Sequence, residues 1–375
     1  MRFFRKKPFQ RCIHGLVGWL LVGLISCQVE PVDPPVDPST VPTDAARGIV
    51  SLFDTYQTVA LSELHYNQEI WDIVEQVLDH PDFQRKVRTI AFEGGNSLYQ
   101  SLMDAYTQGG EVSEAEIKQV WRNNTQVNTT YDAPVYLRMI NHVRSLNQDL
   151  PHDQQIRILL LDPPIDWALV QGPTDYLPFL TERESSMVQV LEKEVYQANQ
   201  NVLFVAGGPH VERSKADSRT KSALTQLEES HPGTTFTVAF YSGFGVEEEE
   251  LPTVENLFAT WPKPGIGLLA DTPIGELPAS INTAAKGPDG QLIDLYPGMQ
   301  LEEIFDAIIY AGKRAELSTS SPSLGVCTGK PEDDEWKTVL LQRQVLVDVP
   351  PPLRATPESI CEPLPARYFD QAIFK

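Results

Sequence analysis

The sequence predicts an α/β fold of three layers (α/β/α), with helices on both faces of a mixed, mostly parallel sheet. Four apolar runs, which predict buried strands, stop at polar residues: Ser62 to His65, Glu93, Asp162, and Gly207 to His210. Segments with apolar residues at helical spacing separate these runs. Alternation of strands and helices is typical of a parallel sheet, because parallel neighbours need a crossover connection that is usually helical.

The elements of the first half follow from capping residues and apolar spacing. A helix begins at Thr43 or Asp44, whose side chains are typical N-caps. Pro134 favours the first turn of another helix, where its missing N–H would have no partner. In chain order we expect a helix over 44–56, a strand through 59, a helix over 70–78, a strand over 87–92, helices over 97–106, 113–121 and 132–147, and a strand over 156–161.

The second half continues the alternation and then becomes less regular. A long helix is expected over 182–198, because Met187, Leu191 and Val195 recur at helical spacing. The turn sequence Pro288-Asp289-Gly290 predicts a hairpin over 282–296. The other expected elements are a strand over 202–206, a helix over 222–229, strands over 235–241 and 305–310, and an edge strand or helix within 339–349.

Polar residues at the ends of the predicted strands form the candidate site. His65 and His210 occupy the same place after two strands, each three residues past a small residue, in a chain with seven histidines. Glu93 follows a third strand. Because ligands bind beyond the carboxyl ends of parallel strands, these side chains are expected to meet in one cleft. Each residue alone could be a structural cap, but the repetition favours a functional centre.

The motifs that the sequence lacks and its net charge disfavour several classes of function. The sequence has no Walker loop, no Rossmann GxGxxG, no GxSxG elbow and no HExxH, so nucleotide-dependent and serine-nucleophile mechanisms lose their support. The formal net charge is −21, and without the five basic residues near the N-terminus 25 basic residues face 51 acidic ones, or about −26. No nucleic acid is therefore expected as a partner.

The N-terminus is typical of a targeting signal. Basic residues precede a short apolar stretch that ends in Leu24-Ile25-Ser26-Cys27 and is well short of the ~20 residues of a membrane-spanning helix. Residues 1–26 are therefore expected to be a lipoprotein signal peptide, and Cys27, which resembles a lipobox cysteine, is the expected lipidation site. The Pro-rich residues 27–43 predict a tether to the lipid bilayer. The expected location is the cell envelope, at the outer membrane and facing the periplasm or the exterior.

Two cysteines remain in the exported chain. Cys327 and Cys361 lie in the extension over 318–375 and lack the CxxC spacing of a metal or redox site. Export favours a disulfide between them. We therefore expect one α/β domain over 44–317, followed by an extension that this bridge ties down and that is not a second globular domain.

Together these motifs resemble those of the erythromycin-esterase-like superfamily, which also contains iron-regulated haem-binding lipoproteins and, more distantly, Tiki-type metalloproteases. The matching segments are Ser62-Glu63-Leu64-His65, Phe92-Glu93-Gly94-Gly95, Leu161-Asp162, 183–187, Gly207-Gly208-Pro209-His210 and 305–310. The resemblance implies a three-layer α/β fold in which both histidines face one cleft. The Glu63-Leu64-His65 spacing is nearer the haem-binding and metalloprotease branches, so macrolide hydrolysis is not implied.

The favoured function is a hydrolase that acts on a small-molecule substrate. Its candidate catalytic residues are Glu63, His65, Glu93 and His210. In one version a divalent metal is held by His65 and His210 with a carboxylate, Glu93 or Glu63, which leaves a position for water. In the other, a histidine oriented by a glutamate is the general base without any metal.

Two further roles remain open. Arg183 and Arg213 are candidates for binding a substrate carboxylate or phosphate. The alternative function is uptake of haem or iron without catalysis, in which His65, Tyr66 or His210 is the axial ligand. Both functions use the same cleft, so the sequence leaves them as alternatives.

Overall fold

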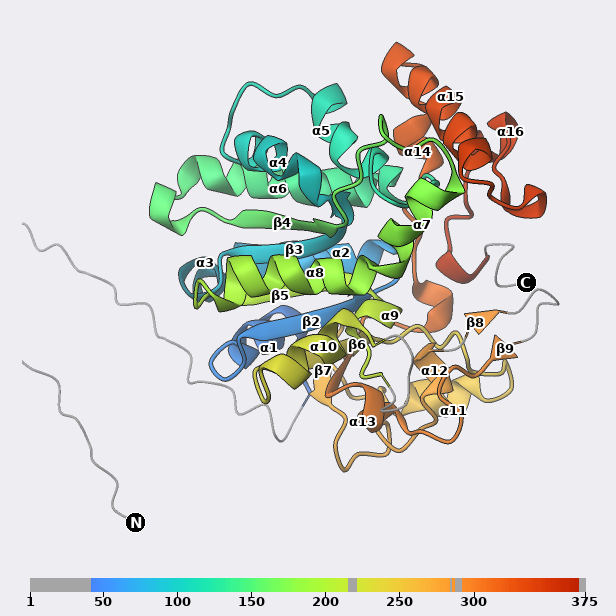
Figure 1. The fold of residues 1–375 in the computed structure, drawn as a ribbon. Coiled ribbons are helices and arrows are strands. Elements are labelled where there is room, and N and C mark those ends of the chain that lie inside the picture. The colour runs from blue at the N-terminus through green and yellow to red at the C-terminus, as the bar shows by residue number, and fades with distance from the viewer. Residues whose placement is uncertain (1–41, 215–220, 284, 287–291, 371–375) are drawn as a thin grey trace, which may run out of the picture. The chain divides into compact units, whose positions relative to one another are not determined.

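The structure is a computed structural model that describes residues 42–214, 221–283, 285–286 and 292–370 (Figure 1). The expected signal peptide, Cys27 and nearly all of the expected tether lie outside the described residues, as does the predicted turn Pro288-Asp289-Gly290. Among the described residues, no helix has the length and apolar character to cross a membrane.

The described chain builds one mixed sheet of eight strands, in the order β1-β7-β10-β6-β2-β5-β3-β4. From β10 to β4 all neighbours are parallel, whereas β7 and β1 are antiparallel additions at one edge. The strands are β1 Thr43–Asp44, β2 Thr58–Glu63, β3 Thr89–Asn96, β4 Arg157–Asp162, β5 Val202–Gly207, β6 Thr235–Phe240, β7 Gly265–Leu268 and β10 Ala307–Tyr310. A separate hairpin pairs β8 Ala285–Lys286 with β9 Leu292–Ile293.

Helices cover both faces of the sheet, which confirms the predicted fold class (Figure 1). One layer contains α1 Ala45–Leu52, α2 Gln68–Asp79, α3 Pro81–Lys86, α4 Gln100–Thr107, α5 Glu114–Arg122 and α6 Pro134–Asp149. The other contains α8 Arg183–Leu191 and α10 Ala223–Ser230, with the short helix α9 Gly208–Val211 directly after β5. Smaller helices are α7 Pro173–Thr181, α11 Leu251–Asn256, α12 Ser280–Thr283 and α13 Leu301–Ile304.

Alternation along the strands explains the layers. Leu61 and Phe92 point into the core beneath α2 and α6, whereas Ala60, Ala91 and Phe204 pack against α8 and α10. Side chains of a strand alternate between the two faces, so a strand buried on both sides reads as a continuous apolar run. This is the pattern that the sequence shows in its central strands.

The structure adds and corrects some elements. The edge strand β7 and helix α7 were not predicted: β7 contains two glycines in four residues, and α7 has Pro178 in its interior. The helix predicted over 182–198 ends as α8 at Leu191 and continues as a π-helical turn over Glu192–Tyr196. Of the two alternatives for 339–349, the helix is correct, since α15 runs over Pro331–Leu346.

The C-terminal extension packs on the domain through its helices α14 Ser323–Val326, α15 and α16 Pro357–Cys361. A disulfide joins Cys327 to Cys361, whose Cα atoms are 5.6 Å apart. A buried ion network holds α15 to the body: the Arg122 guanidinium donates to Asp132 at 2.9 Å and to Asp333 at 2.6 Å. The extension therefore has both a covalent link within itself and a buried charged link to the domain.

Candidate active site

The order of the central strands brings the predicted polar residues together. Strand β5 lies between β2 and β3, and all three are parallel, so their carboxyl ends lie at one edge of the sheet. Glu63 ends β2, Glu93 follows Phe92, the last residue of β3 that pairs with β5, and Gly207 ends β5 just before His210. This register is the physical reason that residues more than a hundred positions apart in sequence become neighbours.

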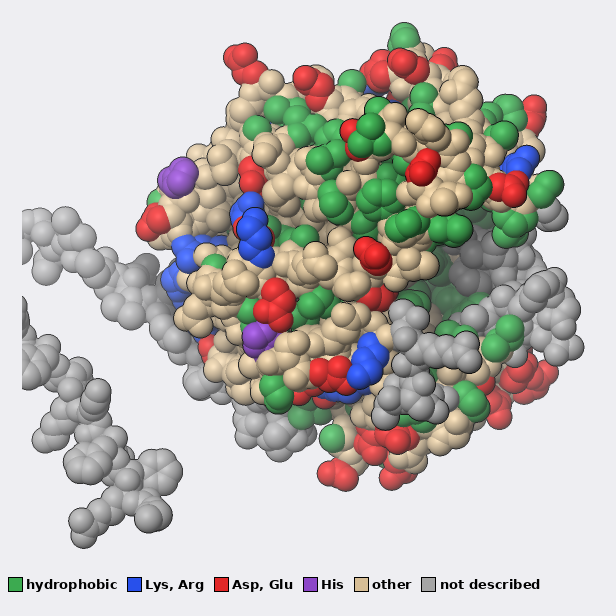
Figure 2. Space-filling model, viewed as in Figure 1, with side chains coloured by type: hydrophobic (Ala, Val, Ile, Leu, Met, Phe, Trp, Pro, Cys, Tyr) green, Lys and Arg blue, Asp and Glu red, His purple; other side chains and the backbone are tan. Residues whose placement is uncertain are grey.

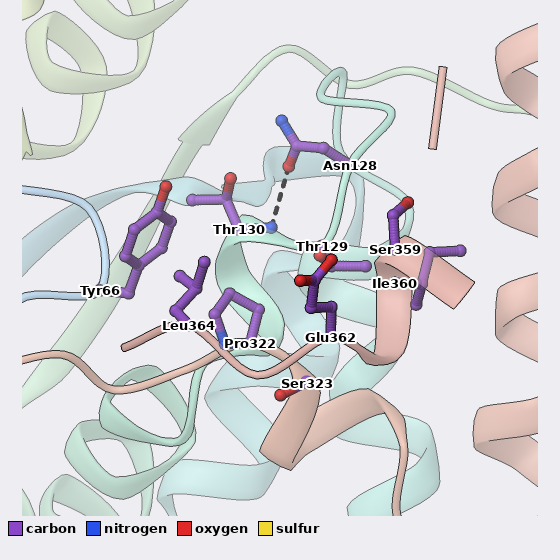
Figure 3. A pocket seen from close by; sticks show the side chains of 10 residues that line it. All are labelled: Tyr66, Asn128, Thr129, Thr130, Pro322, Ser323, Ser359, Ile360, Glu362 and Leu364. Carbon is purple, nitrogen blue, oxygen red and sulfur yellow. Dashed lines mark hydrogen bonds between the residues drawn. The ribbon is translucent and has the colours of Figure 1, made fainter. Parts of the chain in front are cut away.

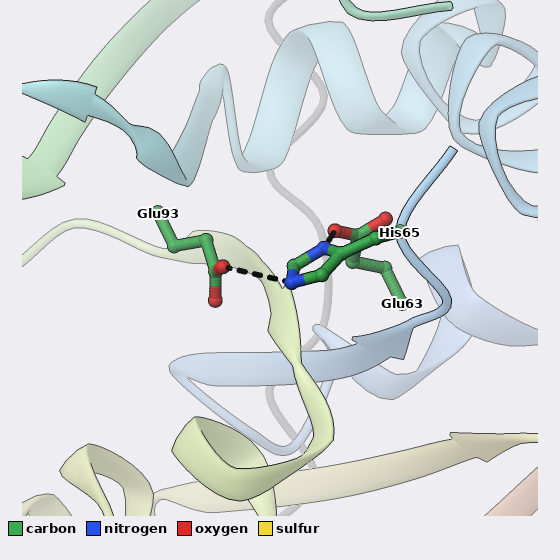
Figure 4. Close-up of side chains that lie close together, drawn as sticks. All are labelled: Glu63, His65 and Glu93. Atoms are coloured by element: carbon green, nitrogen blue, oxygen red, sulfur yellow. Dashed lines mark hydrogen bonds and ion pairs between the residues drawn. The ribbon is translucent and has the colours of Figure 1, made fainter. Parts of the chain in front are cut away.

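His65 is paired with a buried carboxylate (Figure 4). Its Nδ1 lies 2.5 Å from Oε1 of Glu63, and its Nε2 lies 3.8 Å from Oε1 of Glu93. Trp71 and Tyr136 both donate to the Glu63 carboxylate, so that group is fixed from behind. The Glu63 side chain is fully buried, whereas that of His65 is 35% exposed. His65 can thus meet a ligand, and Glu63 can only orient it.

Glu93 lies between the two histidines. Its Oε2 accepts the Gly207 N–H at 2.7 Å and lies 3.3 Å from Nε2 of His210, and its Oε1 accepts the Tyr131 hydroxyl. Burial by itself would raise the pKa of this carboxyl group, but nearby positive charge, from His210 first and then from Arg183 and His65, lowers the pKa to about 2. Glu93 is therefore ionised across the physiological range.

His210 forms a second histidine–carboxylate pair. Its Nδ1 lies 2.5 Å from Oε1 of Glu184, and the other Glu184 oxygen accepts the Ala223 N–H. Its Nε2 lies 3.1 Å from Nη1 of Arg183. Nε2 therefore lies close to both the Arg183 guanidinium and the Glu93 carboxylate, which is 3.3 Å away. The side chain of His210 is 12% exposed, so it is less open to solvent than His65.

Arg183 brings a permanent positive charge into the cluster. Its Nε donates to the buried Asp162 at 2.9 Å, and Asp162 is held in turn by the N–H and hydroxyl of Thr125. Its Nη2 lies 3.8 Å from Oε1 of Glu93 and is buried without a hydrogen-bond partner in the part of the chain that the structure describes. A buried donor without a partner is uncommon and costly, so its position beside Glu93 indicates that it serves a bound group.

The charges around His65 determine its protonation. Burial disfavours the imidazolium, but the Glu63 carboxylate, through its charge and hydrogen bond, and then Glu93 outweigh that effect and raise the pKa of His65 to about 9. His65 is therefore mostly protonated at neutral pH, with the charge balanced by two buried carboxylates.

The fit of a divalent metal depends on which atoms converge. Glu63, His65 and Glu93 each offer an atom within 4.8 Å of the others. However, Glu63 lies at Nδ1 and Glu93 faces Nε2, which are opposite edges of one ring, and one imidazole nitrogen binds one metal. The other set, with His210 in place of Glu63, has the Arg183 guanidinium against His210 Nε2. A permanent cation in that position repels a metal cation, so these contacts favour a centre that works without a metal.

The other candidate residues lie elsewhere. Arg213 pairs with Asp306 at 2.7 Å, away from the contacts that join the two histidines, so the structure does not bring it into the site. Tyr66 lies next to the site with its ring centre 6.4 Å from that of His65. It shares no hydrogen bond with Glu93 or His210 among the described contacts.

Sequence reasoning missed two residues that complete the site. Glu184 orients His210, and Tyr131 donates to Glu93. Glu184 lies directly after Arg183 in the segment that carried the family resemblance, which was an available signal. Tyr131 lies in a polar stretch with no periodic pattern, and nothing in its local sequence marks it.

Comparison with known proteins gives likenesses of fold. No protein-family model matches the chain, and no curated protein matches it. The chain is similar to a solved variant of the erythromycin esterase EreC in its open conformation, at 11% identity and a TM-score of 0.47, over 74% of this chain and 96% of that one. A Bacillus cereus protein has 11% identity and a TM-score of 0.45, over 73% and 93% of the two chains. A succinoglycan biosynthesis protein has 13% identity and a TM-score of 0.44, over 69% and 88%. These likenesses concern the course of the backbone and not the chemistry of the site.

Proposed function

We propose that the protein is a hydrolase of uncharged carboxylic esters that activates water with the Glu63–His65 pair and uses no metal. The observation that carries this proposal is the half-exposed His65, whose Nδ1 is fixed by a buried carboxylate while its Nε2 faces the space beside Glu93. A histidine oriented in this way is a typical general base.

The base form of His65 fits the first step. With Nδ1–H donating to Glu63, the free Nε2 accepts a proton from a water molecule that attacks the ester carbonyl carbon. A water at about 2.8 Å from both Nε2 and Glu93 fits, because these atoms are 3.8 Å apart. The carbonyl π electrons move to oxygen, and Glu63 stabilises the imidazolium. The intermediate then expels an alkoxide that takes the proton from His65, giving an acid and an alcohol.

Ester hydrolysis also requires stabilisation of the negative charge that develops on the carbonyl oxygen. Arg183 supplies this stabilisation. Its buried Nη2 has no hydrogen-bond partner among the described residues and lies 3.8 Å from Oε1 of Glu93, so a small movement of the side chain toward the substrate would let it donate to a carbonyl oxygen. Preorganised donors of this kind are often the largest single contribution to acyl transfer. No serine, threonine or cysteine side chain bonds either site histidine in the described chain, which favours direct attack by water over a covalent intermediate.

The charge of the site limits the substrate. Glu63, Glu93, Asp162 and Glu184 surround it, and Arg183 already neutralises part of this charge. Acidic side chains are also spread over the face of the molecule that Figure 2 shows. An anionic substrate such as a phosphate ester would be repelled. An uncharged ester fits better than the carboxylate or phosphate first expected for Arg183.

The alternative, haem uptake, has less support. The cavity that borders Tyr66 has a volume of about 190 Å³. Sites for drug-sized ligands occupy roughly 300–1,000 Å³, and a haem is larger than such ligands. Both nitrogens of His210 are also engaged, by Glu184 and Arg183, so this histidine is poorly placed as an axial ligand.

The pH dependence of hydrolysis tests the proposal. Only neutral His65 accepts a proton, and its pKa is raised above the ordinary 6.5 to about 9. We therefore expect kcat/KM to rise about tenfold per pH unit between pH 6 and 8 and to level off above about 9. Glu63→Gln removes the charge that holds the pKa up, so its profile should level off at lower pH. Stopped assays with p-nitrophenyl acetate, corrected for spontaneous hydrolysis, measure both profiles. A parental profile that is flat from pH 6 to 9 would contradict the role of His65.

The lipid anchor remains a separate proposal that rests on the N-terminal sequence. We expect Cys27→Ser to abolish incorporation of labelled fatty acid, because the thiol that is expected to carry the lipid is then missing. Membrane fractionation of cells that express the full chain measures the consequence. If the variant stays in the detergent phase like the parent, the envelope attachment has another origin.

A further inference from the structure

A cavity of about 190 Å³ is lined by Tyr66 and Thr130, among other residues (Figure 3). Tyr66 forms one side of it, and Tyr66 follows the proposed base His65. Thr130 forms another part, and the next residue, Tyr131, bonds Glu93 and has its ring centre 5.7 Å from that of His65. The cavity is therefore connected to the candidate site through two pairs of consecutive residues, His65 with Tyr66 and Thr130 with Tyr131.

Tyr66 is fixed in position by its backbone. Its φ of 52° lies in the left-handed region, which a bulky residue rarely adopts. Its N–H donates to the Tyr136 hydroxyl, and its carbonyl accepts the Ser320 N–H. Backbone in such a conformation persists only where its surroundings hold it, and it is commonly found at ligand sites.

The opposite wall comes from the C-terminal extension. Ser323 lies on α14, and Ser359 and Ile360 lie on α16 (Figure 3). The disulfide between Cys327 and Cys361 connects the ends of these two helices. The wall is thus a covalently linked unit, and the extension completes a cavity that the α/β domain alone would leave open.

The lining indicates the chemistry of an occupant. The hydroxyl groups of Tyr66, Thr129 and Thr130 have no hydrogen-bond partner among the described residues, and they are not buried, so they are available to a ligand. Ile360 and Leu364 add an apolar surface. Among the described lining residues none is a lysine or arginine and Glu362 is acidic, which disfavours an anion. The volume corresponds to about six water molecules at ~30 Å³ each, which fits one ring of a larger molecule.

We propose that this cavity is a specificity subsite that binds an uncharged, hydroxyl-bearing ring of the substrate, as in a pyranose sugar. Hydroxyl groups along the edge of such a ring meet the free hydroxyls of Tyr66 and Thr130, and its C–H face meets Ile360. The inference deepens the proposed function and rests on it, because it makes the preferred substrate an ester that carries a sugar.

Binding tests the subsite independently of turnover. The probes are methyl glycosides of glucose, galactose, mannose and rhamnose, measured by saturation-transfer NMR and titration. We expect at least one of them to bind the parent. Thr129→Trp, which fills the cavity, should weaken binding at least tenfold. Thr130→Val, which keeps the shape and removes one free hydroxyl, should weaken it about threefold to tenfold. The control Leu353→Trp changes a residue that is 74% exposed and outside the cavity, and should bind like the parent.

The outcomes separate the two proposals. If no glycoside binds the parent, or if Thr129→Trp and Thr130→Val both bind like the control, the subsite is wrong even when p-nitrophenyl acetate is hydrolysed. If a glycoside binds in the predicted manner while no ester is hydrolysed, the subsite stands as a binding site and the proposed hydrolase fails.

Discussion

Replacing His65 with alanine will lower kcat/KM for p-nitrophenyl acetate by about 10²–10⁴-fold, the range that a general base contributes. The fold should survive, because the side chain of His65 is 35% exposed and lies beyond the end of β2. The double variant with His210→Ala should be scarcely slower than His65→Ala alone, since residues that act as one unit are not additive. Initial rates measure the change in kcat/KM, and a thermal melt of each variant shows whether the fold survives.

The matched control for this prediction is His142→Ala. His142 also pairs with a carboxylate, Asp79 at 2.7 Å, but this pair joins α6 to the end of α2. Its loss should change kcat/KM less than twofold. Retention of more than a tenth of the parental rate by His65→Ala would remove His65 as the base. Loss of the parental rate after dialysis against EDTA would restore the metal-dependent mechanism, and a Soret band in the purified protein would restore the haem alternative.

Replacing Arg122 with methionine will lower the free energy of unfolding by about 3–5 kcal/mol, as expected when one partner of a buried ion pair is removed. Arg122 is fully buried and bonds both Asp132 and Asp333. Lys118 still reaches Asp333 at 3.3 Å, but Asp132 then has no positively charged partner among its described contacts. Urea unfolding measures the loss, and faster proteolysis after residue 318 should accompany it, because Asp333 belongs to the extension.

Arg138→Met is the control for the effect of burial. Arg138 also bridges two carboxylates, Asp72 at 2.5 Å and Glu75 at 2.7 Å, but its side chain is 38% exposed. Ion pairs at the surface contribute about 0–1 kcal/mol to stability, so Arg138→Met should lower the free energy of unfolding only slightly. If Arg122→Met and Arg138→Met lower the free energy of unfolding equally, the buried network does not stabilise the extension.

The central part of the fold could be predicted because its signals are local. Runs such as 158–161 and 202–206 are apolar without alternation, and this is required of strands that helices cover on both sides. The antiparallel edge could not be predicted in the same way. Strand β7 has two glycines in four residues, and only its pairing with β10 makes it a strand.

The candidate site was predictable in part. The meeting of His65, Glu93 and His210 follows from three local signals and one geometric rule, that carboxyl ends of parallel strands lie at the same edge. The rule gives proximity but no distances. It therefore left open whether the histidines bind a metal, and it placed Arg213 in the site although Asp306 holds that residue elsewhere.

The sequence by itself determined the layered α/β architecture and the gathering of histidines and a glutamate at one edge of the sheet, because apolar periodicity and strand direction are encoded over a few neighbouring residues. Only the tertiary structure decided what these residues can do. The position of Arg183 against His210, the bond from Tyr131 to Glu93, and the cavity between Tyr66 and α16 each join segments that are far apart in the chain. Such contacts depend on side-chain direction and packing between elements, which no local pattern records.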